Sequence, residues 1–296
     1  MRRVSVGLRL LVQALFFFAA LPLQYLAIRL GWRLAGWLPV YFHRLFLRMF
    51  GLRIEVNGRL ARDAPVLVLA NHVSWLDISV IGSLGPLSFV AKSEVEHWPV
   101  VGLFARLQRT VFIDRARRAH TAEVNATVAR RLAGGDIIVL FPEGTSSDGN
   151  RVLPFRSSLV GAARAALSAS GAGTIQLQPL AITYTRRNGL PLTRRDRPEI
   201  AWYGDMDLAP HLAALLAGGP FEARVTFGAP IPFDAASNRK RATAKAEAAV
   251  RRAFHAAVIP ELPQGPNPKA MDKRDRAVAV SAQPWVPGSG LRRAPE

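Results

Sequence analysis

Cysteine is missing altogether from this sequence of 296 residues. Its absence excludes disulfide bonds, thiolate nucleophiles and cysteine metal sites, and it is consistent with a reducing compartment. Acidic residues are scarce as well, because 21 Asp and Glu stand against 39 Lys and Arg, which leaves a formal charge of +18. A charge of this sign makes nucleic acid, anionic lipid and acidic carrier proteins candidate partners.

Two further absences narrow the class of protein. The sequence has no Gly-x-Ser-x-Gly nucleophile elbow, so nothing supports a serine hydrolase of that kind. It also has no internal repeat. Half of the residues are hydrophobic and a fifth are charged, which excludes a mainly disordered chain. The length is enough for one large α/β domain or for two small domains.

The amino-terminal part contains a long uncharged stretch. Residues 10–28 carry no charge and lie between Arg9 and Arg29. At 19 residues the stretch is just long enough to cross the hydrocarbon core of a bilayer. A signal peptide is the alternative, since Arg2, Arg3 and Arg9 resemble its basic amino-terminal region.

The segment at 32–50 is aromatic and apolar but carries basic residues, which predicts an amphipathic helix at a membrane interface. Residues 1–63 contain ten arginines against Glu55 and Asp63. Positive charge beside apolar sequence fits an anionic membrane surface better than a nucleic-acid groove. We therefore predict that residues 1–50 form a membrane-anchoring helical hairpin, with both of its ends cytoplasmic.

From residue 53 onward, short apolar runs alternate with helical patterns. The predicted strands are 53–57, 66–70, 87–91, 110–113, 136–141, 176–184 and 223–227. Continuous apolar runs are typical of strands covered on both faces. We predict a single α/β domain at 51–258, with a largely parallel, roughly seven-stranded sheet flanked by helices. Prolines without periodicity predict a disordered tail at 259–296.

The run Asn-His-Val-Ser-Trp-Leu-Asp at 71–77 follows the predicted strand at 66–70. His72 is therefore expected at the end of a strand and Asp77 in the first turn of the next helix, so that a tight turn brings carboxylate and imidazole together. Such a pair is a general base with its orienting partner. Ser74 and Asp77 also match a capping box, which is a purely structural alternative.

A second polar block, Phe-Pro-Glu-Gly-Thr-Ser-Ser at 141–147, follows the most apolar predicted strand, 136–141. Open α/β sheets bind their ligands at the carboxyl ends of the strands. Alone, this block reads as an ordinary polar loop between a strand and a helix. Two such blocks at one edge of a sheet favour a catalytic or binding site.

Together these segments resemble the 1-acylglycerol-3-phosphate acyltransferase family. That family has a histidine and an aspartate separated by four residues (an HX4D motif), as at His72 and Asp77, and a Phe-Pro-Glu-Gly-Thr block, as at 141–145. Three further segments match in order: 91–95, 112–115 and 178–180. The resemblance covers roughly residues 50–230.

The resemblance implies an enzyme that transfers a fatty acyl group from acyl carrier protein or acyl-CoA to the hydroxyl of a lysolipid. His72 would be the base and Asp77 would orient it, without an acyl-enzyme, a metal or a bound cofactor. The acceptor's polar head would be bound by Arg115, Glu143, Gly144, Thr145 and Lys92. For Lys92, a solvated surface lysine is an equal alternative. The implied location is the inner membrane, with the site facing the cytoplasm and no nucleic-acid partner.

One departure from the family bears on the acceptor. Phosphate-accepting relatives usually have arginine where this sequence has Ser146, and arginine is the natural bidentate ligand of phosphate. Residues 150–156 and 202–208 resemble the branch that acylates lyso-ornithine lipid. Three carboxylates could bind a head group that carries an ammonium: Asp148, Asp205 and Asp207. The alternative is that they are solvated carboxylates of surface loops. Lyso-ornithine lipid is the expected acceptor, with 1-acylglycerol-3-phosphate as the alternative.

A different class of protein also fits the charge. A basic membrane- or nucleic-acid-binding protein without enzymatic activity would account for Arg194, Arg195 and the basic run at 239–241. A charge run is usually a solvated face, and this reading leaves the ordered set of family blocks unexplained.

Overall fold

The computed structural model describes residues 2–62, 64–113, 118–170 and 173–258 of the chain. All the elements described below belong to one compact unit, residues 1–258. The tail predicted at 259–296 lies outside the described residues.

The centre of the fold is a nine-stranded sheet, mostly parallel. Its strands are β1 (Arg53–Asn57), β2 (Val66–Ala70), β3 (Ser88–Lys92), β4 (Val111–Ile113), β5 (Ile138–Leu140), β6 (Ile175–Arg187), β7 (Leu190–Pro191), β8 (Phe221–Phe227) and β9 (Ile231–Phe233). The main order is β1-β8-β6-β2-β5-β3-β4, and β7 and β9 also pair with β6. β6 pairs antiparallel with β7, β8 and β9. The predicted α/β class, the mainly parallel sheet and all seven predicted strands are confirmed.

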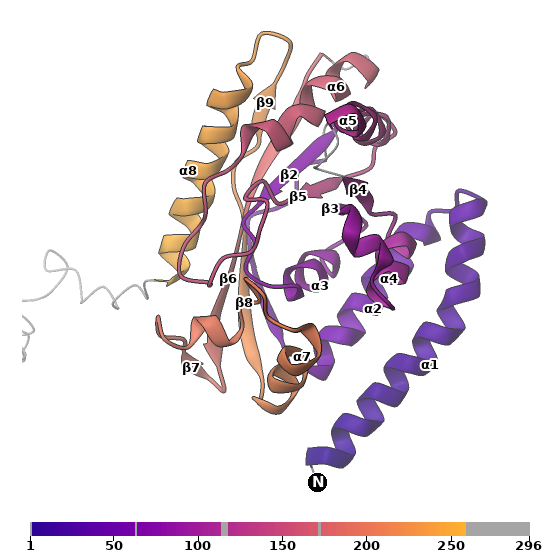
Figure 1. Ribbon diagram of the computed structural model, residues 1–296, viewed down its shortest axis with the longest axis vertical. Helices are drawn as coiled ribbons and strands as arrows, with labels where there is room; N and C mark the ends of the chain where they lie inside the picture. Colours follow the sequence, from indigo (N-terminus) through magenta and orange to yellow (C-terminus); the bar gives the residue numbers. More distant parts are fainter. Residues whose placement is uncertain (1, 63, 114–117, 171–172, 259–296) are drawn as a thin grey trace, which may run out of the picture. The chain divides into compact units, whose positions relative to one another are not determined.

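Helices cover both faces of the sheet (Figure 1). They are α1 (Arg2–Arg29), α2 (Leu34–Met49), α3 (Leu76–Gly82), α4 (Val101–Leu107), α5 (Arg118–Ala133), α6 (Gly161–Ser170), α7 (Leu208–Ala217) and α8 (Arg239–Val258). Short 3-10 helices are η1 (Ser93–His97), η2 (Ser157–Val160) and η3 (Arg197–Glu199). The core on one face includes residues of α2, α3 and α7, and the core on the other includes residues of α5, α6 and α8.

Strand β2 shows why its sequence is continuously apolar. Val66 and Val68 belong to the core on the face of α2, α3 and α7, which we call the first core. Leu67 and Leu69 belong to the second core, on the face of α5, α6 and α8. Successive side chains of a strand point to opposite faces, so a central strand with helices on both sides buries every residue. All five residues of β2 are buried.

Helices α1 and α2 pack against each other and form the hairpin expected at the amino terminus (Figure 1). By length and composition alone, residues 11–29 form a helix long and apolar enough to cross a membrane. Large apolar side chains on α1 are exposed, among them Leu11, Leu15 and Phe18. By contrast, α2 contributes Leu47 and Met49 to the first core, so it is also part of the domain.

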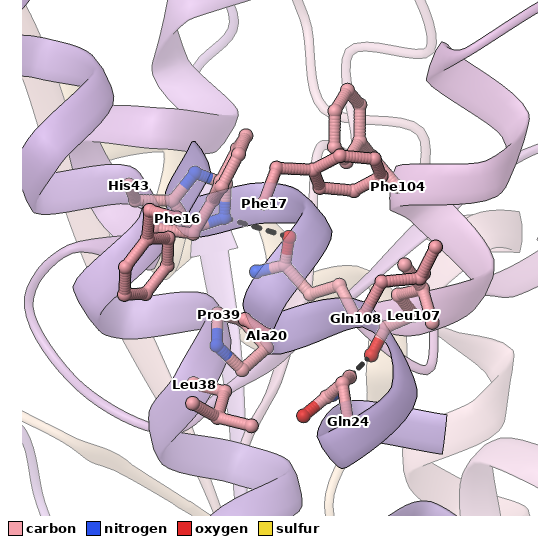
Figure 2. Close-up of a pocket in the computed structure, with 12 residues that line it drawn as sticks. Phe16, Phe17, Ala20, Gln24, Leu38, Pro39, His43, Phe104, Leu107 and Gln108 are labelled. Atoms are coloured by element: carbon pink, nitrogen blue, oxygen red, sulfur yellow. Dashed lines mark hydrogen bonds between the residues drawn. The ribbon is translucent and has the colours of Figure 1, made fainter. Parts of the chain in front are cut away.

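Hydrogen bonds of buried polar side chains connect the hairpin to the rest of the domain, within a contact that is otherwise apolar. Figure 2 shows an apolar pocket between α1, α2 and α4, at which His43 Nε2 and Gln108 Oε1 lie 2.8 Å apart. His43 Nδ1 lies 3.2 Å from the hydroxyl of Ser79 on α3. The amide nitrogen of Gln24 donates to the carbonyl of Leu107 at 2.7 Å. Because these groups are largely buried, their mutual hydrogen bonds specify how the helices meet.

Candidate active site

The carboxyl ends of the parallel strands bring the sequence blocks to one edge of the sheet. β2 pairs in parallel with β5, and β5 with β3, so all three strands end on the same side. His72 lies two residues beyond β2, Lys92 is the last residue of β3, and Glu143 lies three residues beyond β5. Arg115, which the sequence placed in this group, lies outside the described residues.

His72 and Asp77 are in direct contact. The imidazole Nδ1 of His72 lies 2.8 Å from Oδ2 of Asp77, and Asp77 is completely buried. Because a buried carboxylate accepts hydrogen bonds, it selects the tautomer in which Nδ1 carries the proton. The lone pair is then on Nε2. The side chain of His72 is 21% exposed, so this nitrogen belongs to a ring that solvent reaches.

Three further groups hold the Asp77 carboxylate in place. Its Oδ2 accepts hydrogen bonds from the backbone amides of Val73 at 2.6 Å and Ser74 at 3.0 Å. Its Oδ1 accepts a hydrogen bond from the hydroxyl of Tyr184 at 2.8 Å. Only one half of the predicted capping box forms: Asp77 accepts the Ser74 amide, but the Ser74 hydroxyl has no partner among the described residues, and the N-cap of α3 receives no side-chain hydrogen bond. Asp77 therefore joins the loop before α3 to the His72 ring, and the catalytic role of the pair stays a prediction.

A ring stack and a backbone hydrogen bond also hold His72 in place. It stacks on the ring of Phe141 with centroids 4.2 Å apart and planes inclined by 20°. The carbonyl of His72 accepts a hydrogen bond from the amide of Ser147 at 2.9 Å. The two sequence blocks are thus joined directly, and contacts within the protein hold the His72 ring in place. Preorganisation of this kind lowers the cost of reaching the reactive geometry.

Glu143 is buried behind this edge. Only 2% of the residue is exposed, and neither carboxylate oxygen makes a hydrogen bond of normal distance and angle with a described residue. Burial raises the pKa of Glu143 from 4.5 to about 9, although the nearby amides of Leu153 and His72 act to lower it. Removing a carboxylate from water disfavours its charged form, so the acid is neutral at pH 7.

The remaining predicted acceptor ligands lie nearer to solvent. Gly144 has a φ of 79°, a left-handed conformation that suits glycine, and it makes the turn after β5. Thr145 and Lys92 are exposed at the same edge of the sheet. Ser146, at the position where phosphate-accepting relatives have arginine, donates its hydroxyl to the carbonyl of Trp202.

The three carboxylates considered for a cationic head group differ in their surroundings. Asp148 accepts hydrogen bonds from the amide and the side chain of Asn150, at 3.1 Å and 3.4 Å, so it organises its own loop. Asp205 and Asp207 are exposed in the segment that leads into α7. Their contribution to recognition stays a prediction.

Sequence reasoning missed three residues that build the site. Tyr184 was seen only as the end of a predicted strand. Asn71 was part of the motif without a role, yet its side chain makes two hydrogen bonds to the backbone of Ile182, at 2.8 Å and 3.0 Å. The amide of Trp202 donates to the carbonyl of Val73 at 2.9 Å. None of these contacts is local, and no periodicity in the sequence signals them.

Comparisons with known proteins agree with this geometry. The Acyltransferase family model matches residues 53–183, which includes both sequence blocks. The Lyso-ornithine lipid O-acyltransferase of Brucella abortus is 46% identical over 247 residues, 82% of this chain and 92% of that protein. The protein of that name from Rhizobium meliloti is 42% identical over 92% of this chain and 91% of its own length.

A more distant relative has a different name. The 1-acyl-sn-glycerol-3-phosphate acyltransferase of Neisseria gonorrhoeae is 42% identical over 115 residues, 38% of this chain and 45% of that protein. Identity over nearly the full length of the first two relatives decides the family. This chain is an acyltransferase and belongs to the family of the lyso-ornithine lipid and 1-acylglycerol-3-phosphate acyltransferases.

Proposed function

We propose that this enzyme transfers a fatty acyl group from a thioester to the hydroxyl of a lysolipid, and that lyso-ornithine lipid is its preferred acceptor. The observation that carries the proposal is the contact of 2.8 Å between His72 Nδ1 and Asp77 Oδ2 at the carboxyl edge of the sheet. A paired imidazole with a free Nε2 is suited to deprotonating a hydroxyl.

The proposed reaction is a direct acyl transfer. Nε2 of His72 takes the proton as the acceptor hydroxyl oxygen attacks the carbonyl carbon of the thioester. The tetrahedral intermediate collapses, the carbon–sulfur bond breaks, and the imidazolium returns its proton to the leaving thiolate. The products are an ester and a free thiol. Asp77 stabilises the imidazolium between the two proton transfers. This route requires no metal, no bound cofactor and no covalent enzyme intermediate.

The choice of acceptor rests on Ser146 and on the relatives. A phosphate head group without a bidentate arginine loses a strong charge-assisted contact. The two relatives matched over most of their length are named for lyso-ornithine lipid, whereas the relative named for 1-acyl-sn-glycerol-3-phosphate is matched over 38% of this chain. Specificity is a difference between two affinities, so both acceptors must be compared in one assay.

The deciding experiment incubates the purified enzyme with each lysolipid and either acyl-CoA or acyl carrier protein. Product mass identifies the acceptor, and thiol release gives the rate. We expect faster acylation of lyso-ornithine lipid, and Ser146→Arg should shift the preference towards 1-acylglycerol-3-phosphate. Equal or faster turnover of 1-acylglycerol-3-phosphate by the wild type would overturn the acceptor assignment. Thiol release that never depends on a lysolipid would overturn the transferase reaction itself.

Membrane attachment is the remaining part of the proposal. A lysolipid acceptor resides in a bilayer, and α1 exposes apolar side chains along a segment, residues 11–29, that is long enough to enter one. We place the enzyme on the inner membrane with the His72 site on the cytoplasmic side. That side supplies both acyl-CoA and acyl carrier protein.

A further inference from the structure

A short protrusion between η1 and α4 exposes three consecutive residues of low polarity, Trp98, Pro99 and Val100. Trp98 is 39% exposed and Val100 is 63% exposed. Isolated apolar residues on a surface are ordinary, but a run of three is unfavourable in water unless it serves a contact. We call these three residues the apolar tip.

The apolar tip is held in a defined shape. The amide of Gly102 donates to the carbonyl of Trp98 at 2.9 Å, and a guanidinium nitrogen of Arg106 donates to the carbonyl of Glu96 at 3.0 Å. A Cβ at Gly102 would lie 2.1 Å from the carbonyl oxygen of Glu96, so only glycine permits this close approach of η1 and α4. The close contact between η1 and α4 therefore fixes the conformation of the tip.

Val100 is strained as well as exposed. Its φ of 63° lies in the left-handed region, which β-branched residues strongly disfavour. Glycine would adopt the same backbone without this cost. A strained apolar side chain at an exposed tip therefore points to a role for the side chain itself, since neither burial nor backbone geometry accounts for it.

The apolar tip adjoins a helix that packs against the hairpin. The amide of Phe104 bonds to the carbonyl of Val100 at 3.0 Å, one turn along α4. The ring of Phe104 meets that of Phe17 on α1 with centroids 4.9 Å apart. In Figure 1, α4 lies on the same side of the sheet as α1 and α2. The helix that carries the tip thus packs on the helix proposed to enter the membrane.

The apolar tip is also connected to the catalytic edge. The indole of Trp98 meets the indole of Trp202 edge to face, with centroids 6.1 Å apart. The amide of Trp202 in turn bonds to the carbonyl of Val73, the residue after His72, at 2.9 Å. One indole contact and one hydrogen bond therefore connect the tip to the site.

We propose that the apolar tip is a second membrane contact, which inserts into the interface of a lipid bilayer and holds the His72 site at the lipid surface. The inference rests on the proposed function, because only a membrane-borne acceptor makes such placement useful. Aromatic and apolar side chains at a fixed tip favour the interfacial region of a bilayer. Nearby charges are of both signs, Lys92 and Arg106 against Glu94 and Glu96, so this contact depends on apolar insertion rather than on anionic lipid.

The absence of cysteine allows a direct test on the full chain. Val100→Cys creates a single thiol for an environment-sensitive fluorophore, and Leu190→Cys is the matched control. Leu190 is 71% exposed on β7, which pairs with β6. Both proteins are reconstituted in phosphatidylcholine vesicles. We expect nitroxide-labelled lipid to quench the label at position 100 and aqueous iodide to quench the label at position 190.

Two other quenching results would contradict the proposal. A label at position 100 that iodide quenches as strongly as the control would place the tip in water. Protection from both quenchers would place it against protein, either a second copy of the chain or another partner. A result unchanged by high salt is expected, because insertion of apolar groups is not screened as charge contacts are.

A second test links the contact to acyl transfer. Val100→Gly relieves the backbone strain and Trp98→Ser removes the indole, while Leu190→Gly is the control. With the lysolipid in vesicles, we expect each tip variant to lower the rate by about tenfold, the scale of one lost apolar side chain. With the lysolipid in detergent micelles, the rate should equal that of the wild type.

The two proposals fail in different ways. Equal rates for the tip variants and the wild type on vesicles would overturn the membrane role of the tip while leaving acyl transfer intact. Equal losses on vesicles and micelles would show that the tip supports the fold or the site instead. If no lysolipid is acylated, the proposed function fails, yet the quenching experiment still reports whether position 100 meets lipid.

Discussion

At the scale of single residues, the site depends on how Asp77 is surrounded. Four donors converge on its buried carboxylate: the imidazole of His72, the amides of Val73 and Ser74, and the hydroxyl of Tyr184. A carboxylate held from four directions has one orientation, and so has the imidazole bonded to it. The pair is positioned by the fold rather than by the substrate.

His72→Ala should abolish most of the activity without unfolding the protein. A positioned general base contributes roughly 10²–10⁴-fold, so kcat should fall by about that factor. Asp77→Asn should also be severe, because it removes the charge that stabilises the imidazolium. The rate of thiol release measures the loss, and circular dichroism verifies the fold. If His72→Ala keeps more than about a tenth of the wild-type rate, the proposed mechanism is wrong.

Tyr184→Phe separates orientation from charge. The variant keeps the ring and the Asp77 carboxylate but removes the hydrogen bond of 2.8 Å to Oδ1. We expect a smaller loss than in Asp77→Asn, on the order of tenfold, the value of one such bond to a charged group. Steady-state kinetics of the three variants gives the comparison. A loss as large as that of His72→Ala would assign Tyr184 a direct part in the reaction.

Glu143 predicts a specific dependence of stability on pH. Its pKa is 4.5 when exposed and about 9 in the fold. Between these values the folded protein holds a proton that the unfolded chain releases, so this group lowers stability progressively as pH rises from about 4.5 to about 9. Below that window both states are protonated, and the group contributes nothing.

Glu143→Gln should remove this effect, because an amide does not titrate. The melting temperature of the variant should rise relative to that of the wild type as the pH is raised from about 5 to about 8, a range that lies between the two pKa values of Glu143. Thermal scans of both proteins across this range provide the measurement. A difference that stays constant with pH would show that Glu143 is ionised in the folded protein.

At the scale of elements, the contact between α2 and α3 depends on one glycine. A Cβ at Gly82 would lie 2.6 Å from Cδ2 of His43 and 2.8 Å from its Nε2. The His43 ring cannot easily move away, since it is bonded to Gln108 and Ser79. The absence of a side chain at Gly82 therefore lets the hairpin helix reach the helix that carries Asp77.

Gly82→Ala should lower the free energy of unfolding by about 1–3 kcal/mol, as overpacking of a tight contact does. Gly85→Ala is the matched control, because a Cβ there meets no atom within 4 Å. The control should be neutral, or slightly stabilising through a stiffer unfolded chain. Denaturant unfolding in matched detergent gives both values. Equal stability of the two variants would mean that α2 shifts freely against α3.

At the scale of the whole molecule, two deletions distinguish anchor from core. Removal of residues 1–30 takes away α1, whereas removal of 1–50 also takes away α2, which contributes Leu47 and Met49 to the first core. Uncovering buried apolar surface costs about 25 cal/mol for each Å². We expect the shorter deletion to keep the fold and the longer one to destabilise it.

Fractionation of the shorter deletion tests the anchor itself. High salt screens contacts of basic residues with anionic lipid. We therefore expect a substantial share of this protein in the soluble fraction at high salt, while the full-length protein stays with the membrane. A deletion protein found entirely in the pellet under these conditions would place the anchor outside α1.

The seven predicted strands and the placement of both polar blocks at one edge of the sheet follow from the sequence alone. Continuous apolar runs identify strands covered on both faces, and parallel strands end at a common edge, so His72 and the 141–147 block were expected at the same edge. That their strands β2 and β5 are neighbours was seen only in the structure. These inferences succeed because they depend on local periodicity and on the geometry of a sheet. The amino-terminal hairpin was recognised in the same way, from length and apolar composition.

The packing of distant elements, which no local pattern reveals, sets which groups complete the site and where polar side chains point. The hydroxyl of Tyr184 reaches Asp77 across 107 residues of chain, and β6 turns out to pair antiparallel with β8. Glu143, which the sequence assigned to the acceptor, is buried, and its part in acceptor binding stays a prediction. Such contacts are set by how whole elements pack, because a local pattern gives the period of burial but not the partner that a buried group meets.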